Sequence, residues 1–315
     1  MKNRKSFIIG LKSTSLELNE IRFIKKYKPW GIILFKRNIK SIKQSKILTD
    51  NIKKIFNDYK FPILIDQEGG KVNRLSNIID VSFFTSEFFG KLYKKNTSKF
   101  EVFYKIFIKQ TSYLLKSIGA NINTVPVLDL RYKKKHNIIG NRSFGSNPKT
   151  VSKIGDFCIK EYLKNNIGTS IKHIPGHGLA KVDSHQKTPV VKETFKKLIK
   201  TDFYPFKNKK SLLAMTAHII YEKIDPIFTA THSKKIIKLI RKKIGFKNLI
   251  ISDDISMKGL KFNIKDNVNN SFKAGCNLVL HCNGKMSEMI VVAKNAPKVD
   301  SFIVKKTSQF YKKLS

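Results

Sequence analysis

Acidic side chains stand where two apolar runs of the chain end. Residues 249–251 are all aliphatic and are soon followed by the pair Asp253 and Asp254, while residues 63–65 lead directly to Asp66. Two adjacent carboxylates could bind a metal ion, share a proton, or divide into a nucleophile and a partner that orients it. An apolar run of this kind is typical of a strand buried on both faces, so acids at its end are expected to be functional.

A third apolar run leads into a segment that is dense in ionisable side chains. Residues 172–185 hold three histidines, two lysines and an aspartate. His173 and His177 have the i, i+4 spacing of a helical metal site, but Pro175 and the glycines on either side of His177 break any helix that would place both on one face. We therefore predict no metal site, and we expect His177 to be a structural residue of a turn.

Asp183 and His185 occupy alternate positions, which suggests a catalytic dyad. On an extended loop the carboxylate can hold one ring nitrogen while the other faces a substrate. A histidine titrates near neutral pH and can deliver a proton to a leaving oxygen, and a nearby carboxylate stabilises its charged form. An ordinary surface histidine is the alternative at this point.

Further polar groups follow the run at 63–65. Asp66 could accept the hydrogens of two sugar hydroxyls, and the glycine pair 69–70 lets backbone approach a ligand closely. Arg74 and Arg142 offer planar donors suited to hydroxyl, carbonyl or carboxylate groups. Taken singly, each arginine is more often a surface residue.

The elements that must position these side chains form an alternating pattern. Short β-rich runs recur with amphipathic, helix-length segments between them, which indicates repeated βα units and a parallel sheet. We place eight strands: Ser6–Ile9, Gly31–Phe35, Pro62–Asp66, Asn121–Val125, Gly168–His173, Leu212–His218, Leu249–Asp253 and Asn277–His281. The expected helices include Ser41–Tyr59, Phe100–Ile118, Thr150–Asn166, Lys192–Phe206 and Ser233–Ile244.

The polar residues decide between two α/β architectures. An open doubly wound sheet would also alternate strands and helices, but in a closed (β/α)8 barrel of the TIM type the C-terminal strand ends converge on one mouth. No linker or repeat divides the chain, so we expect residues 1–315 to form one barrel domain, with long loops at 140–147 and 174–190 over its mouth.

Composition limits the other classes of function. The net charge of +41 would attract polyanions, yet the lysines are spread along the whole chain, so we favour a solvated surface over a nucleic-acid site. The rival, a nucleic-acid-binding barrel, predicts strongly salt-dependent binding and leaves the acid-tipped strands unexplained. Three cysteines without metal-type spacing suggest reduced thiols. The apolar run at 7–9 is too short for a signal peptide, and no membrane-spanning stretch is present, so we expect a cytoplasmic protein.

Together these segments resemble glycoside hydrolase family 3, and within it the single-domain β-N-acetylglucosaminidases of cell-wall recycling. The resemblance runs from about Gly31 to Asn283. The motifs D-Q-E-G-G-K-V-N-R, K-H-I-P-G-H-G with V-D-S-H, A-H-I, I-I-S-D-D-I-S-M and G-C-N-L-V-L-H-C-N-G occur in the family's order. Such a set is far more specific than any one match.

The resemblance implies a role for each motif residue. Asp253 would be the nucleophile that forms a covalent glycosyl-enzyme, His185 the general acid and then base, and Asp183 its partner, with net retention at the anomeric carbon. Asp254 would be a neighbour and not the attacker. The positions that would hold the terminal N-acetylglucosamine are Asp66, Arg74, Arg142, Lys172 and His173.

The implied substrate is a muropeptide that carries terminal β-linked N-acetylglucosamine on anhydro-N-acetylmuramic acid, and a monomer without cofactor would suffice. Two positions depart from the family: Lys71 replaces a common arginine, and Leu179-Ala180 replaces Asp-Thr. Neither removes an expected catalytic group. Phosphate is already an anion, so a neutral histidine need not activate it as the acceptor of the second step. Whether water or phosphate accepts the sugar therefore stays open.

Overall fold

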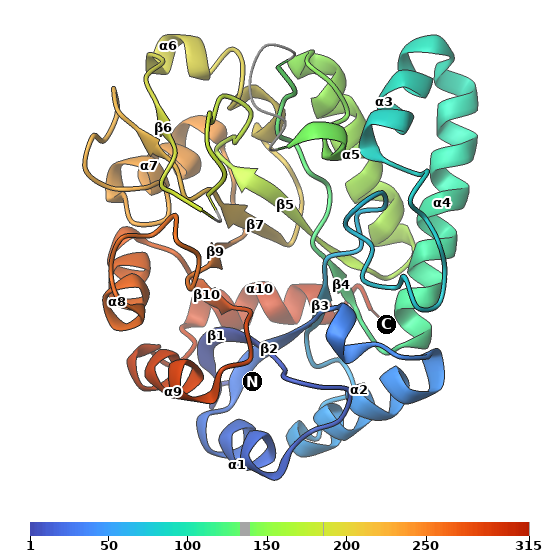
Figure 1. Ribbon diagram of the computed structural model, residues 1–315, viewed down its shortest axis with the longest axis vertical. Coiled ribbons are helices and arrows are strands. Elements are labelled where there is room, and N and C mark those ends of the chain that lie inside the picture. Colours follow the sequence, from blue (N-terminus) through green and yellow to red (C-terminus); the bar gives the residue numbers. More distant parts are fainter. Residues whose placement is uncertain (133–138, 185, 315) are drawn as a thin grey trace.

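Eight parallel strands form a closed barrel (Figure 1). The computed structural model describes residues 1–132, 139–184 and 186–314. Around the barrel the strands follow the order β1-β10-β9-β7-β5-β4-β3-β2, and β1 also pairs with β2, which closes the ring. Their bounds are β1 (Lys5–Gly10), β2 (Pro29–Leu34), β3 (Ile63–Ile65), β4 (Ile122–Asn123), β5 (Gly168–Ile174), β7 (Leu213–Thr216), β9 (Leu249–Asp254) and β10 (Leu278–His281).

Each of the eight expected strands is present, with ends that differ by a few residues from the prediction. The doubly wound alternative is wrong, because an open sheet has two edge strands with one partner each, whereas each of these eight strands pairs on both sides. The α/β class and the (β/α)8 barrel are therefore confirmed.

Alternation along the strands divides the core into two layers. In β1, Phe7 and Ile9 pack outward against the helices, whereas Ile8 points into the barrel. The interior cluster is filled by aliphatic side chains from most of the strands, among them Ile8, Ile33, Leu64, Ile122, Met215, Ile251 and Leu280. The barrel is thus a packed core and not a pore.

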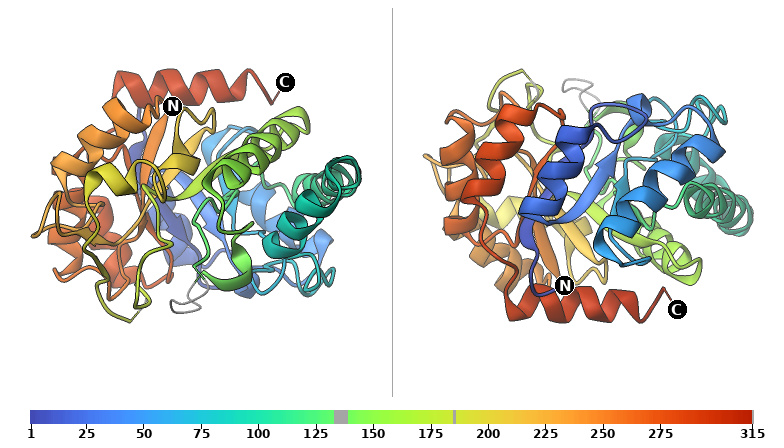
Figure 2. Two further views of the ribbon diagram at one scale, coloured as in Figure 1. Left: turned by 90° about the horizontal axis from the view of Figure 1, so that it is seen from above. Right: turned by 90° about the horizontal axis from the view of Figure 1, so that it is seen from below.

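The last helix, α10 (Ser301–Tyr311), closes one end of the barrel. Its Ile303 and Phe310 join the interior cluster, and Trp30 of β2 donates a hydrogen bond of 2.9 Å to Thr307. Both views of Figure 2 show α10 along one edge of the molecule, opposite the loop that follows β5. The other end of the barrel remains available for a site.

Nine further helices surround the barrel or cover its connections: α1 (Leu18–Tyr27), α2 (Ile42–Phe56), α3 (Ser86–Lys95), α4 (Thr97–Ser117), α5 (Pro148–Lys164), α6 (Phe195–Leu198), α7 (Lys234–Leu239), α8 (Ile264–Ala274) and α9 (Met286–Asn295); this count applies to the described ranges. Side chains of Ser41 and Ser233 cap α2 and α7. Within the described residues, no helix is both long and apolar enough to cross a membrane.

One expected helix is wrong. Residues 192–206 form the four-residue α6 and a short 3-10 turn at Tyr204–Phe206 instead of a continuous helix. The helix ends at Leu198, seven residues before Pro205, and Pro205 itself lies within the 3-10 turn. The sequence also gave no indication of the small sheet in which β6 (Val190–Val191) pairs with β8 (Ile220–Tyr221).

Candidate functional site

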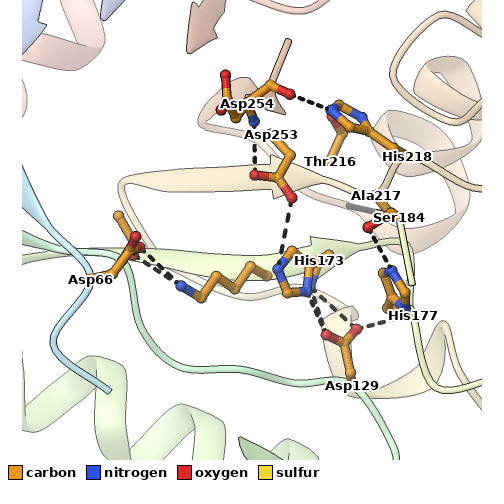
Figure 3. A network of polar contacts seen from close by, with 12 residues as sticks. Asp66, Asp129, His173, His177, Ser184, Thr216, Ala217, His218, Asp253 and Asp254 are labelled. Carbon is orange, nitrogen blue, oxygen red and sulfur yellow. Dashed lines mark hydrogen bonds and ion pairs between the residues drawn. The ribbon is translucent and has the colours of Figure 1, made fainter. Parts of the chain in front are cut away.

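Four strand ends bring polar side chains together at the barrel mouth. Asp66 follows β3, His173 lies near the end of β5, His218 follows β7, and Asp253 lies in β9. Figure 3 shows Asp253 pointing towards His173, which lies between Asp253 and Asp129. Residues far apart in sequence therefore share one site.

A buried ion cluster lies beside this group. The Nζ of Lys172 is 3.0 Å from Oδ1 of Asp66 and 2.6 Å from Oε1 of Glu68. Arg142 donates from Nε and Nη2 to the two oxygens of Glu68, each at 2.8 Å, and Arg74 lies 3.3 Å from Asp66. Four of the expected sugar-binding residues thus contact one another, directly or through Glu68.

The cluster holds its two acids in their charged forms. Burial would raise the pKa of Glu68, but Arg142 and Lys172 outweigh burial and lower that pKa to about 2. Burial would also raise the pKa of Asp66, but the charges of Lys172 and Arg74 lower that pKa below its ordinary value. The side chain of Asp66 is 14% exposed and that of Glu68 only 2%. Asp66 can therefore accept hydrogen bonds from a ligand, while Glu68 supports the two cations.

Asp129 fixes the ring of His173. Its Oδ2 lies 2.6 Å from Nδ1 of His173, and its carboxylate also accepts the backbone N–H groups of His173 and His177. Because a carboxylate accepts, Nδ1 carries the hydrogen of this contact. The opposite nitrogen, Nε2, lies 3.9 Å from Oδ2 of Asp253. Asp129 thereby sets the direction in which His173 faces the mouth.

Asp253 is held as a carboxylate. Burial would raise its pKa, but the combined effect of His173, His218, the backbone N–H of Asp254 and Lys172 lowers it below the ordinary value. The N–H of Asp254 donates to Oδ1 of Asp253 at 2.8 Å. The side chain is 17% exposed, so one side of this anion remains accessible from the mouth.

Asp254 has a different task. Its Oδ1 accepts the N–H groups of Ser256 and Cys282 at 3.1 and 3.2 Å, and its Oδ2 accepts the hydroxyl of Ser256 at 2.8 Å. These bonds tie the ends of β9 and β10 to the turn that follows β9. Since both oxygens are engaged by the protein, Asp254 orients the strand end and leaves Asp253 as the accessible acid.

His218 anchors the same strand end from the side. A carbonyl can only accept, so Nε2 of His218 donates to the carbonyl of Asp254 at 3.0 Å. Burial lowers the pKa of His218 and favours the neutral ring, in which Nδ1 accepts from the hydroxyl of Thr231 at 2.7 Å. His218 stands in the A-H-I motif, but nothing local in the sequence indicates its bond to residue 254.

The expected dyad is described only in part. His185 lies outside the described residues. The carbonyl of Asp183 accepts from the N–H groups of Gln186 and Lys187 at 2.9 and 3.0 Å. The pairing of Asp183 with His185 stays a prediction.

His177 is a buried structural residue, in agreement with its expected role in a turn. Its Nε2 lies 3.3 Å from the hydroxyl of Ser184, and burial, followed by the neighbouring His173, lowers its pKa to about 4. The ring is therefore neutral at pH 7. Among the described residues, no group of histidine, cysteine, aspartate and glutamate side chains has the arrangement of a metal site.

The sequence prediction missed three residues that support the site. Glu68 lies within the D-Q-E-G-G motif, Asp129 follows β4, and Thr124 contacts both Asp66 and Lys172. Asp129 was among the polar residues near strand ends that were expected to converge on the barrel mouth, but it was given no role, and Glu68 could have been singled out in the same way. Their partners depend on the closed barrel, and no local spacing shows them.

Comparison with known proteins adds the family. The model of the glycosyl hydrolase family 3 N-terminal domain matches residues 9–307. A β-hexosaminidase of Neisseria gonorrhoeae is 33% identical over 263 residues, which cover 80% of this chain and 71% of that protein. A β-hexosaminidase of Haemophilus ducreyi is 32% identical over 289 residues, with 88% and 80% covered.

Solved structures agree with this result. Native NagZ from Neisseria gonorrhoeae superposes with a TM-score of 0.88 at 28% identity, over 98% of this chain and 90% of that one. A β-N-acetylglucosaminidase from Thermotoga maritima gives a TM-score of 0.76 at 28% identity and is covered to 66% of its length. With acid-tipped barrel strands, a family match over nearly the whole sequence and these relatives, the chain belongs to glycosyl hydrolase family 3 and is a glycoside hydrolase.

Proposed function

We propose that this enzyme is a β-N-acetylhexosaminidase that releases terminal, non-reducing β-linked N-acetylglucosamine from peptidoglycan fragments, with retention of configuration. The proposal rests above all on one observation: the ionised, partly exposed carboxylate of Asp253 at the end of β9. The names of the relatives, β-hexosaminidase and NagZ, support the choice of sugar.

The first step of the proposed reaction forms a glycosyl-enzyme. An Oδ of Asp253 bonds to the anomeric carbon while the bond from that carbon to the leaving oxygen breaks, and His185 gives its proton to that oxygen. In the second step neutral His185 takes a proton from water, which attacks the same carbon and frees Asp253. Two inversions give net retention. Asp183 is the proposed partner of the imidazole.

The ion cluster supplies a surface for sugar hydroxyls. Asp66 is the accessible acceptor, and Lys172 and Arg74 lie against it as donors. Arg142 and His173 complete the proposed binding set. Arg142 would use the part of its guanidinium group that does not bond to Glu68. Because these charges are already paired and held in place, binding the sugar requires little reorganisation.

Several further features belong to the same proposal. Residues 1–315 act as one catalytic domain and as a monomer, without cofactor or metal ion. The net charge of +41 favours encounter with the carboxylates of a muropeptide over a neutral disaccharide. The three cysteines Cys158, Cys276 and Cys282 are unpaired, which supports a reducing, cytoplasmic location.

Hydrolysis of aryl β-N-acetylglucosaminides by the wild type, Asp253→Ala and His185→Ala tests this function. Asp253→Ala should lose nearly all activity. In kcat/KM, which reports the first step, His185→Ala should lose about 10²- to 10⁴-fold on a substrate with a poor leaving group, the usual contribution of general acid catalysis. The loss of kcat/KM should be far smaller with 2,4-dinitrophenolate, which needs little protonation. Equal activity of all three proteins would reject the site.

Controls separate the proposal from its rivals. Aryl β-glucoside and aryl β-N-acetylgalactosaminide test the choice of sugar, and proton NMR of the first product anomer tests retention. Reactions with and without phosphate show whether a sugar 1-phosphate forms in place of the free sugar. A salt titration against random DNA tests the nucleic-acid alternative.

A further inference from the structure

The backbone between the two proposed dyad residues is pressed against the turn that follows β9. Ser184, which joins Asp183 to His185, is buried, with 4% of its surface exposed. Its hydroxyl lies 3.3 Å from Nε2 of His177. Its carbonyl faces Gly259, a buried residue of the turn.

Gly259 is a glycine for reasons of space and not of backbone conformation. It is absent from the glycines with positive φ, so its backbone is open to any residue. A Cβ at this position, however, would lie 2.6 Å from the carbonyl oxygen of Ser184 and 3.2 Å from Cβ of both Ser184 and His218. The first of these distances is shorter than real Cβ contacts. The segment at Ser184 can approach this closely only because position 259 has no side chain.

A second contact fixes the segment at its other end. The hydroxyl of Thr188 donates to the carbonyl of Gly259 at 2.9 Å. Ser184 and Thr188 therefore contact the same residue of the turn from positions on both sides of the loop that carries His185.

The turn itself is tied to the end of β9. The N–H of Met257 donates to the carbonyl of Asp254 at 3.1 Å, and the N–H of Leu260 donates to the carbonyl of Met257 at 3.1 Å. The carbonyl of Asp254 also accepts from His218 at 3.0 Å, and the N–H of Asp254 holds Asp253. A short chain of bonds thus connects Gly259 to the proposed nucleophile.

We propose that Gly259 is a positioning residue for catalysis: it is the docking point that holds Ser184 and Thr188, the described residues on either side of His185, against the turn that follows Asp253. The inference rests on the proposed function. The inference assigns to Gly259 no contact with the sugar. A substitution that disrupts the contact between Gly259 and Ser184 should therefore affect proton transfer and leave substrate binding intact.

The test is Gly259→Ala, assayed on a pair of aryl β-N-acetylglucosaminides with poor and good leaving groups. The added methyl should push Ser184 outward and lower kcat/KM, which reports the first step, at least about 10-fold on the poor leaving group, against the 10²-fold or more that complete loss of an acid catalyst costs. With 2,4-dinitrophenolate the loss of kcat/KM should stay within about 3-fold, because this leaving group needs little protonation. Lys258→Ala, at the exposed neighbouring position, is the matched control and should behave as wild type.

Thr188→Val provides a second variant if Gly259→Ala does not fold. It removes the hydrogen bond to Gly259 without adding bulk and should give a smaller loss with the same dependence on the leaving group. Equal losses on both substrates, or wild-type rates, in whichever of the two variants folds would overturn the inference. The proposed function fails separately, if His185→Ala itself shows no dependence on the leaving group.

Discussion

Neutralising Glu68 is the sharpest test of the buried ion cluster. Glu68→Gln keeps the shape of the side chain and removes one negative charge. Arg142 then loses its bidentate carboxylate, and Lys172 retains a single carboxylate partner, Asp66 at 3.0 Å. A buried cation without full compensation destabilises the folded state, so we expect a large loss of stability from this single substitution.

The magnitude follows from the pKa of Glu68. It falls from 4.5 to about 2, and since each unit is worth about 1.4 kcal/mol, the ion cluster stabilises the ionised, folded state by about 3 kcal/mol. Removal of one partner from a buried ion pair typically costs about 3 to 5 kcal/mol, which agrees. Because the folded pKa lies below the unfolded one, this stability is fully present above pH 4.5 and is lost as the pH falls through about 2.

Urea unfolding followed by the fluorescence of the single tryptophan, Trp30, measures this loss. At pH 7 the free energy of unfolding of Glu68→Gln should be about 3 kcal/mol below wild type, and less than about half of that difference should remain at pH 3. Asp50→Asn is the control, because it breaks the exposed pair with Lys46 and should cost no more than about 1 kcal/mol. Equal effects of the two substitutions would refute the argument.

Two further predictions concern activity. Asp129→Asn removes the charge to which His173 donates at 2.6 Å, a bond worth about 1.5 to 3 kcal/mol. The value of kcat/KM for an aryl β-N-acetylglucosaminide should therefore fall about 10- to 150-fold, while the circular dichroism spectrum stays unchanged. A loss below about 3-fold would contradict the role of Asp129. Because the pKa of Asp253 is lowered from 3.8, its side chain stays ionised on acidification. Protonation of Asp253 should therefore cause no fall of kcat/KM at the acidic side of a profile between pH 4 and 9. A fall near pH 5 to 6 that persists in His185→Gln, measured on a dinitrophenyl substrate, would contradict this.

The strands could be predicted because a barrel strand is buried on both faces. Runs such as 63–65 and 249–251 are continuous, aliphatic and followed by an acid, and each feature is local in sequence. The strand β6 is only two residues long, and its pairing with β8 depends on the folded loop around it. The end of α6 at Leu198 has no local signal such as a proline or a glycine in the sequence, and this is why a continuous helix was expected at 192–206.

The partners of the site residues could not be predicted in the same way. Lys172 and Asp66 are 106 positions apart, and His173 and Asp129 are 44 apart. Their contacts depend on which strands are neighbours and on how far each strand end extends. The motifs therefore identified the residue types of the site, whereas the buried role of Glu68 and the anchoring by Asp129 required the structure.

The pairing of β1 with β10 has a consequence for how the chain reaches its native state. Phe7 lies opposite Val279, so the ring is completed only when two distant parts of the sequence meet. Until then β1 and its future neighbour each present a row of unsatisfied amide and carbonyl groups, which invites association with other chains. Truncation before β10 should thus give aggregates during synthesis, and molecular chaperones that shield nascent chains should raise the yield of the intact protein.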